Sequence, residues 1–121
     1  MKALIIDDSR TMRMIIGRIL RELGFEIHEA GNGIEGLDRL REIGQPDITL
    51  VDWNMPEMTG FEFLKAVRAQ SEYDSMKLMM VTTETEMNQV ANALDAGANE
   101  YVMKPFTKDV IKEKLSLLGV A

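Results

Sequence analysis

The segment Asp47-Ile-Thr-Leu-Val-Asp-Trp-Asn-Met-Pro56 decides the fold of this chain. Residues 48–51 are β-branched or apolar, which predicts a short, fully buried strand. Asp52 follows at a position where burial would favour another aliphatic side chain, and Pro56 and Gly60 predict a turn soon afterwards. A strand that ends in an acid and a turn places that acid at the carboxyl edge of a sheet. In open α/β folds this edge is where ligands bind.

The rest of the chain repeats the pattern of a short apolar run followed by a stretch of helical periodicity. Strands are expected at residues 3–6, 25–30, 48–51, 78–81 and 101–103. The apolar positions of the five expected helices are Met12, Ile15, Ile16, Ile19, Leu20 and Leu23; Ile34, Leu37, Leu40 and Ile43; Phe61, Leu64 and Val67; Met87, Val90, Ala91 and Leu94; and Val110, Ile111, Leu115 and Leu118. Residues 71–75 are expected to form a polar loop. This alternation predicts one α/β domain over residues 1–121, with a doubly wound parallel sheet covered by helices on both faces.

The composition is that of an ordinary globular domain. The chain has 121 residues, of which 45% are hydrophobic and 28% are charged. Fourteen basic residues against 20 acidic ones give a net charge of −6, which disfavours binding to nucleic acid. There is no Cys, so neither disulfides nor thiolate metal sites can form, and no apolar run is long enough to span a membrane. We expect a cytoplasmic protein.

Because parallel strands share one carboxyl edge, the residues that end the predicted strands should meet there. These residues are Asp7 and Asp8, Asp52, Thr82 and Lys104. Three converging acids repel one another unless a cation neutralises them, and Mg²⁺ prefers oxygen ligands of this kind. A lysine supplies a point charge suited to phosphate, and a threonine hydroxyl can donate to a phosphoryl oxygen. A carboxylate in this setting can itself attack phosphorus and form an acyl phosphate.

Each of these residues has an ordinary role when taken alone. An acid before a helix favours the helix N-terminus, a threonine suits a strand, and most lysines are solvated. His28 has no acidic or histidine neighbour at ligand spacing and is expected to be structural, and Trp53 and Tyr101 are ordinarily packing residues. The specific signal is the coincidence of acid, acid, threonine and lysine at successive strand ends.

With these residues in place, the chain resembles the receiver domain of two-component response regulators, closest to the single-domain chemotaxis type. The resemblance covers essentially the whole chain. The matching residues are Asp7-Asp8, Asp52-Trp53-Asn54-Met55-Pro56, Gly60, Val81-Thr82 and Lys104-Pro105-Phe106. The resemblance implies a flavodoxin-like fold with strand order 2-1-3-4-5 and a cis peptide bond between Lys104 and Pro105.

The resemblance also implies a role for each matching residue. Asp52 would be the phosphoacceptor, and Asp8, Asp52 and the carbonyl of Asn54 would ligate Mg²⁺, with Asp7 assisting through water. Lys104 would contact the phosphoryl group. Thr82 would move to meet that group, and Tyr101 would report the switch. The expected protein is a monomer that catalyses only its own phosphorylation and dephosphorylation. Its expected partners are a histidine kinase as phosphodonor and a downstream target protein, for which a flagellar switch component is one candidate.

One departure bears on that target. Regulators of enteric-type flagellar motors carry paired lysines at the start of the fourth helix, where this chain has Glu86 and Met87. We therefore expect a target less acidic than the docking peptide of such a motor. The surface expected to bind it is formed by the fourth helix, the fifth strand and the fifth helix, and exposes Met87, Asn88, Tyr101 and Lys108.

Three alternatives stay open at this point. A Mg²⁺-dependent phosphatase with an aspartyl nucleophile has a second acid two residues after the nucleophile, where this chain has Asn54. A flavodoxin-like cofactor carrier needs a phosphate loop rich in Ser, Thr and Gly after its first strand, and the sequence Asp7-Asp8-Ser9-Arg10 has the wrong charge for it. The chain could also be a receiver cut from a larger multidomain regulator.

Overall fold

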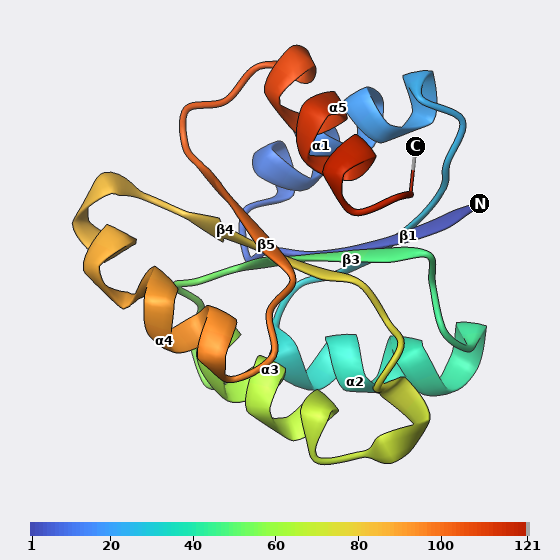
Figure 1. Ribbon diagram of the computed structural model, residues 1–121. Coiled ribbons are helices and arrows are strands. Elements are labelled where there is room, and N and C mark those ends of the chain that lie inside the picture. The colour runs from blue at the N-terminus through green and yellow to red at the C-terminus, as the bar shows by residue number, and fades with distance from the viewer. Residues whose placement is uncertain (121) are drawn as a thin grey trace.

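The computed structural model describes residues 1–120 and shows a parallel sheet between two layers of helices (Figure 1). Five strands alternate with five α-helices, and two short 3₁₀ helices, η1 and η2, lie on either side of the fourth strand. In chain order the elements are β1 (Lys2–Ile6), α1 (Arg10–Glu22), β2 (Glu26–Ala30), α2 (Gly33–Ile43), β3 (Ile48–Asp52), α3 (Gly60–Arg68), η1 (Ser71–Tyr73), β4 (Leu78–Thr82), η2 (Glu84–Gln89), α4 (Val90–Asp95), β5 (Glu100–Met103) and α5 (Lys108–Leu117).

The sheet has the strand order β2-β1-β3-β4-β5, and every pair is parallel. This confirms the order 2-1-3-4-5 and the doubly wound α/β class expected from the sequence. The register aligns Ile6 with Val51, so that Asp7 follows level with Asp52 on the adjacent strand. It also aligns Asp52 with Val81 and Thr82 with Met103. The fold thus brings the ends of β1, β3, β4 and β5 to one edge.

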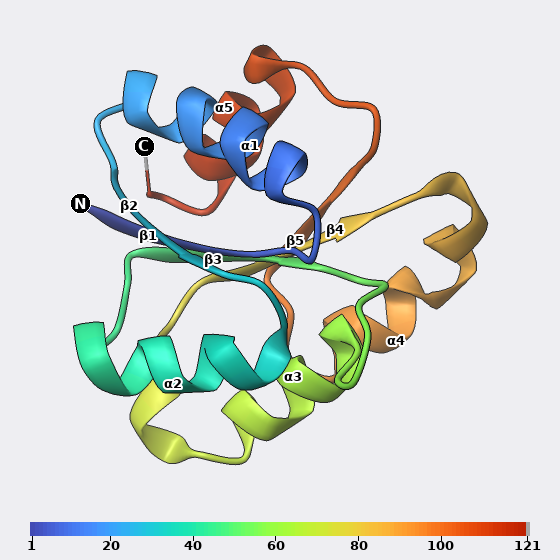
Figure 2. The same ribbon diagram turned by 180° about the vertical axis from the view of Figure 1, so that it is seen from behind.

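Each face of the sheet has its own apolar core. Helices α1 and α5 cover one face, and α2, α3 and α4 cover the other, as both views show (Figures 1 and 2). The first core includes Ile16 and Leu20 of α1 together with Ile111 and Leu115 of α5. The second is centred on Phe63 of α3, which is fully buried. Strands β3 and β4 are buried along their whole length, as a strand between two helical layers must be.

The expected inner face of the last helix was wrong at one position. Val110 is 37% exposed, whereas Ile111 and Leu115 are completely buried. Successive helical residues differ in direction by about 100°. When Ile111 and Leu115, four residues apart, both face the sheet, Val110 must therefore face outward. The same geometry leaves Ile15, Ile34 and Leu94 exposed on the other helices.

The segment between β4 and β5 differs most from expectation. One continuous helix was expected, but residues Glu84–Gln89 form a 3₁₀ helix and only Val90–Asp95 are α-helical. Val90 and Ala93 point inward, and Ala91 is exposed. Likewise the expected polar loop at residues 71–75 contains a 3₁₀ turn, because the ring of Tyr73 is buried and draws the chain onto the core.

No helix in the described part of the chain, residues 1–120, is both long and apolar enough to cross a membrane.

Arg68, at the end of α3, ties together three segments at the amino edge of the sheet. Its Nε donates to the carbonyl of Gly97 at 3.0 Å, Nη1 to that of Tyr73 at 2.6 Å and Nη2 to that of Met76 at 2.7 Å. Nη2 also lies 3.0 Å from Oδ1 of Asn99. One side chain therefore joins α3 to the η1–β4 connection and to the α4–β5 loop.

Replacing Arg68 with Met should destabilise the fold by about 3 kcal/mol, because it removes the donor to three carbonyls, of which only that of Tyr73 keeps another, the N–H of Met76. Arg68→Lys should recover part of the loss, since an ammonium can reach only some of these acceptors. The matched control is Arg41→Met, which removes an exposed ion pair with Asp38 and should cost less than about 1 kcal/mol. Urea unfolding monitored by circular dichroism measures all three. Equal losses at Arg68 and Arg41 would show that the Arg68 contacts contribute nothing.

Candidate functional site: an acidic pocket with one lysine

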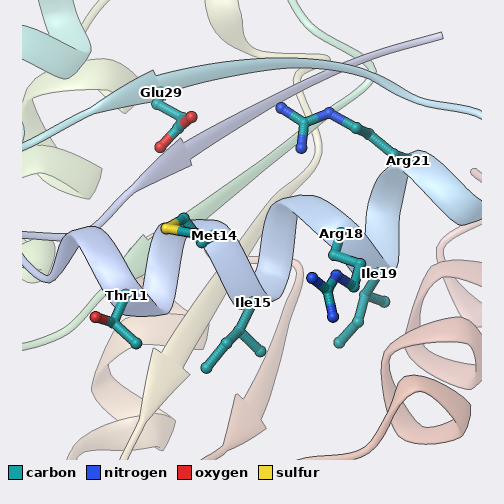
Figure 3. Close-up of a pocket in the computed structure, with 7 residues that line it drawn as sticks. All are labelled: Thr11, Met14, Ile15, Arg18, Ile19, Arg21 and Glu29. Atoms are coloured by element: carbon teal, nitrogen blue, oxygen red, sulfur yellow. The ribbon is translucent and has the colours of Figure 1, made fainter.

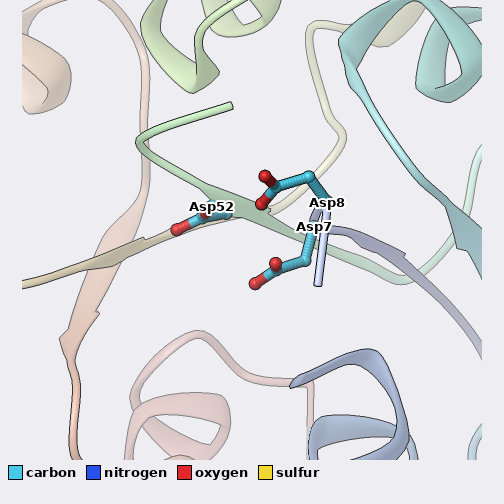
Figure 4. Close-up of side chains that lie close together, drawn as sticks. All are labelled: Asp7, Asp8 and Asp52. Carbon is cyan, nitrogen blue, oxygen red and sulfur yellow. The ribbon is translucent and has the colours of Figure 1, made fainter. Parts of the chain in front are cut away.

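Three carboxylates lie together where β1 and β3 end. Figure 4 shows Asp7 and Asp8 leaving the end of β1 beside Asp52 at the end of β3. One oxygen from each of the three lies within 4.8 Å of the others. Asp7 and Asp52 are only 1% and 6% exposed, whereas Asp8 is exposed and forms the open side of the group. The fold has thus assembled the three acids that the sequence placed at this edge.

The start of α1 positions Asp7. Its Oδ1 accepts a hydrogen bond from the backbone N–H of Ser9 at 2.8 Å. Ser9 in turn caps α1, because its hydroxyl oxygen accepts from the N–H of Met12 at 3.2 Å. Its neighbour Asp8 occupies the tight connection between strand and helix.

Lys104 brings the only side-chain ammonium that is paired with this acidic group within residues 1–120. Its Nζ lies 3.2 Å from Oδ1 of Asp52 and 3.5 Å from Oδ2 of Asp7. The residue follows β5 directly, and its backbone N–H donates to the carbonyl of Thr82 at 2.7 Å. The bond from Lys104 to Pro105 is cis, as expected from the sequence.

The pocket perturbs the pKa values of Asp52 and Lys104 in ways that follow from its charges. Burial, reinforced by the negative charge of Asp7, raises the pKa of Asp52 to about 6 despite the opposing charge of Lys104. Burial alone would lower the pKa of the Lys104 ammonium. The charges of Asp52 and Asp7 outweigh that effect and leave its pKa raised. Asp52 is therefore a carboxylate that is poorly compensated by the groups around it.

This donor set fits a hard divalent cation. When all three acids are ionised, the single ammonium of Lys104 leaves two negative charges uncompensated. The available atoms are carboxylate oxygens, which Mg²⁺ prefers, and the exposed side at Asp8 leaves room for coordinated water. Asn54, whose carbonyl was expected to be a further ligand, lies two residues beyond Asp52 and is exposed. Its expected role as a ligand stays a prediction.

Thr82 ends β4 and Tyr101 lies on β5, and neither takes part in the ion pairs of Lys104 with Asp7 and Asp52. Thr82 is completely buried, and its hydroxyl lies 3.4 Å from the carbonyl of Val102 and 3.8 Å from Sδ of Met87. Tyr101 is half-buried on β5, and Nζ of Lys114 lies 4.4 Å from the centre of its ring. A movement of either residue on phosphorylation stays a prediction.

Trp53 and His28, two other residues considered in the sequence, contact protein side chains outside the acidic pocket. Trp53 is buried and its ring lies 5.7 Å from that of Phe61, so its expected packing role is confirmed. His28 was expected to lack an acidic neighbour, which is wrong, because Nε2 lies 2.7 Å from a carboxylate oxygen of Glu26. The two residues are neighbours because side chains two positions apart on a strand share one face. A single such pair does not make a metal site.

Two further features were not predicted from the sequence. Arg13 donates to the main-chain carbonyl of Asp7, and no motif in the sequence marks that contact. A pocket also lies along the outer side of α1, lined mainly by Met14, Ile15 and Arg18, with Glu29 of β2 above it (Figure 3). None of the three clustered acids lines this pocket.

Comparison with known proteins agrees with this geometry. The response regulator receiver domain matches residues 3–116. A chemotaxis protein CheY homolog from Campylobacter jejuni is 48% identical over 116 residues, which cover 95% of this chain and 89% of the relative. CheY1 of Helicobacter pylori is 44% identical over 98% of this chain and 96% of its own length.

Solved structures give the same result. The structure of chemotaxis response regulator CheY4 of Vibrio cholerae at low pH matches with a TM-score of 0.87 and 36% sequence identity, over 99% of this chain and 98% of that one. A receiver domain protein from Clostridium thermocellum matches with a TM-score of 0.87 and 26% identity, over 96% of this chain and 91% of that one. From the family match over most of its length and relatives at 44 to 48% identity, this chain belongs to the family of response regulator receiver domains.

Proposed function

We propose that this protein is a phosphorylation-activated signalling switch of a chemotaxis pathway. The observation that carries the proposal is the Asp52 carboxylate held between Lys104 and two further acids at one edge of the sheet. The relatives named as chemotaxis proteins match this chain over almost their whole length, which supports that pathway. The proposed upstream partner is a histidine kinase that presents a phosphohistidine.

In the proposed reaction an oxygen of Asp52 attacks the phosphorus atom. The carboxylate–phosphorus bond forms as the phosphorus–nitrogen bond of the donor breaks, and the imidazole departs with the electron pair of that bond. Lys104, which lies beside Asp52, would contact the phosphoryl oxygens, and Asp7 and Asp8 would hold Mg²⁺ together with Asp52. The metal would supply positive charge to offset that of the transferred group. Because Asp52 is itself the acceptor, the proposed protein acts as a switch and turns over no separate substrate.

The proposed output surface is formed by η2, α4, β5 and α5. Lys108 was expected to be exposed on this surface. Its positive charge is offset there, because it forms an ion pair with Glu22 of α1 at 2.7 Å. The large exposed apolar side chains on these elements are Leu94 (42%), Met103 (40%), Val110 (37%) and Leu117 (68%). Exposed apolar side chains on these elements fit a target segment that docks mainly through apolar side chains rather than through acids.

Acetyl phosphate with Mg²⁺ should add one phosphate to the intact chain, and Asp52→Asn should abolish the addition. The reason is that the Asp52 carboxylate lies 3.2 Å from the Lys104 ammonium, whereas Asp7 lies 3.5 Å from it and has its other oxygen bonded to the N–H of Ser9. Intact-mass spectrometry measures the product. Asp95→Asn, at an exposed acid on α4, is the matched control and should be labelled like the wild type. Labelling that persists in Asp52→Asn would place the acceptor elsewhere.

In metal-free buffer Asp52 should make the fold less stable as pH rises. Its pKa is about 6 in the folded chain and about 4 when unfolded, so between these values the folded state binds the extra proton. Below about pH 4 both states are protonated and there is no penalty. Above pH 6 the penalty reaches the order of 3 kcal/mol. Asp52→Asn should therefore gain stability over the wild type as pH rises from 4 to 7.

Urea titrations at pH 4, 5, 6 and 7 measure this difference. Saturating Mg²⁺ should close most of the gap at pH 7 by stabilising the wild type, as any ligand that binds only the folded state must. A difference between the two chains that does not change with pH would mean that the Asp52 carboxylate is already compensated.

Beryllofluoride, a phosphoryl mimic, should change amide exchange far from the metal site. If Thr82 leaves the carbonyl of Val102 to reach the mimic, residues 83–95 and Tyr101 should change their protection, because η2 and β5 pack around that hydroxyl. Hydrogen exchange with mass spectrometry reads the change. Thr82→Ala is the control that should keep the local response at residues 52–54 and lose the remote one. A wild-type response confined to the acidic pocket would contradict the switch.

A further inference from the structure

Arg13 links three elements beside the acidic pocket. Its Nη1 donates to the main-chain carbonyl of Asp7 at 2.6 Å, and its Nε donates to Oε1 of Glu29 at 3.0 Å. Arg13 itself lies in α1, Asp7 follows β1 and Glu29 belongs to β2, from which its carboxylate extends toward α1 (Figure 3). The Arg13 side chain is only 19% exposed, and that of Glu29 is 40% exposed. The guanidinium is therefore largely enclosed between these two partners.

Asp8 is the member of the pocket that has no partner of its own. The carboxylate of Asp7 is held by the N–H of Ser9 and by Lys104, and that of Asp52 is held by Lys104. Asp8 is exposed, and within residues 1–120 no hydrogen bond holds its carboxylate. Its direction therefore depends on the backbone from which it leaves.

The peptide that joins Asp7 to Asp8 sets that direction, and Arg13 holds this peptide. The carbonyl that accepts from Arg13 is part of the same planar unit as the N–H of Asp8. The other end of Asp7 is fixed as well, because its N–H donates to the carbonyl of Ala30 at 3.1 Å. Rotation of the Asp7–Asp8 peptide would break the 2.6 Å contact with Arg13.

Glu29 compensates the charge that Arg13 brings. A guanidinium beside a cation site would repel the cation, yet this one is paired with the carboxylate of Glu29. The pair therefore contributes a fixed hydrogen bond to the Asp7 carbonyl at little cost in net charge. This combination distinguishes Arg13 from Arg10, which is exposed and lies in the same open groove as Asp8.

We propose that Arg13 is a positioning residue for divalent cation binding: it fixes the Asp7–Asp8 peptide and thereby aims the Asp8 carboxylate into the pocket, with Glu29 holding it and offsetting its charge. This inference rests on the proposed metal site. A simple electrostatic effect would have the opposite sign. Loss of a nearby positive charge should tighten cation binding, whereas loss of the positioning contact should weaken it. Whether an Arg13 variant binds Mg²⁺ more tightly or more weakly therefore distinguishes a charge effect from a positioning effect.

The test is a MgCl₂ titration of the full chain, read by the emission of Trp53 and repeated by calorimetry. Trp53 is the single tryptophan and directly follows Asp52. Three variants are compared with the wild type: Arg13→Gln, Arg13→Lys and the matched control Arg10→Gln, which removes the same charge from the same helix. Arg10→Gln should leave the Mg²⁺ affinity unchanged or tighter. Arg13→Gln should weaken it about tenfold, the usual scale for partners that orient a metal ligand.

Arg13→Lys keeps the charge but cannot reach both partners with one ammonium, so it should also weaken Mg²⁺ binding. It decides the question if Arg13→Gln fails to fold, which circular dichroism would reveal. The inference is overturned if Arg13→Gln tightens binding as Arg10→Gln does, or if Arg13→Lys binds like the wild type. A wild-type chain that binds no Mg²⁺ at millimolar concentration would instead overturn the proposed function, and this inference with it.

Discussion

The contact of the Lys104 ammonium with Asp52 and Asp7, at 3.2 and 3.5 Å, is the interaction on which the site depends. Parallel strands necessarily deliver their ends to one edge, and here two of those ends carry acids. A single lysine reduces the repulsion between them without removing it. The site is thus left with an excess of negative charge, and this excess is what makes a cation and a phosphoryl group suitable ligands.

The packing around Asp52 leaves little room for adjustment. Its strand β3 is buried throughout, and Gly60 closes the turn that follows by donating its N–H to the carbonyl of Trp53 at 2.9 Å. A Cβ at Gly60 would collide with the main-chain oxygen of Asp52, so glycine is needed there for space. A rigid strand end on one side and an open groove at Asp8 on the other give the pocket one fixed wall and one accessible side.

Much of this could be predicted from the sequence, because strand ends and turns are local features. The apolar runs located the strands, and the residues that end them located Asp7, Asp8, Asp52 and Lys104. What could not be predicted depends on contacts between distant segments. The bond from Arg13 to the Asp7 carbonyl involves a main-chain acceptor, which leaves no trace in a residue pattern. The 3₁₀ form of residues Glu84–Gln89 and the outward direction of Val110 follow from packing on neighbouring elements.

The contacts of Arg68 have an evolutionary consequence. Three of its four acceptors, at Tyr73, Met76 and Gly97, are main-chain carbonyls, which every amino acid carries. The side chains at Tyr73 and Met76 can therefore change without removing the acceptor atoms. Gly97 cannot change in this way, because its φ is +117° and an added Cβ would lie 2.9 Å from Cγ of Arg68, and Arg68 itself cannot change either. A lineage of such chains can diversify the surface at this end of the molecule and still inherit the same scaffold beneath it.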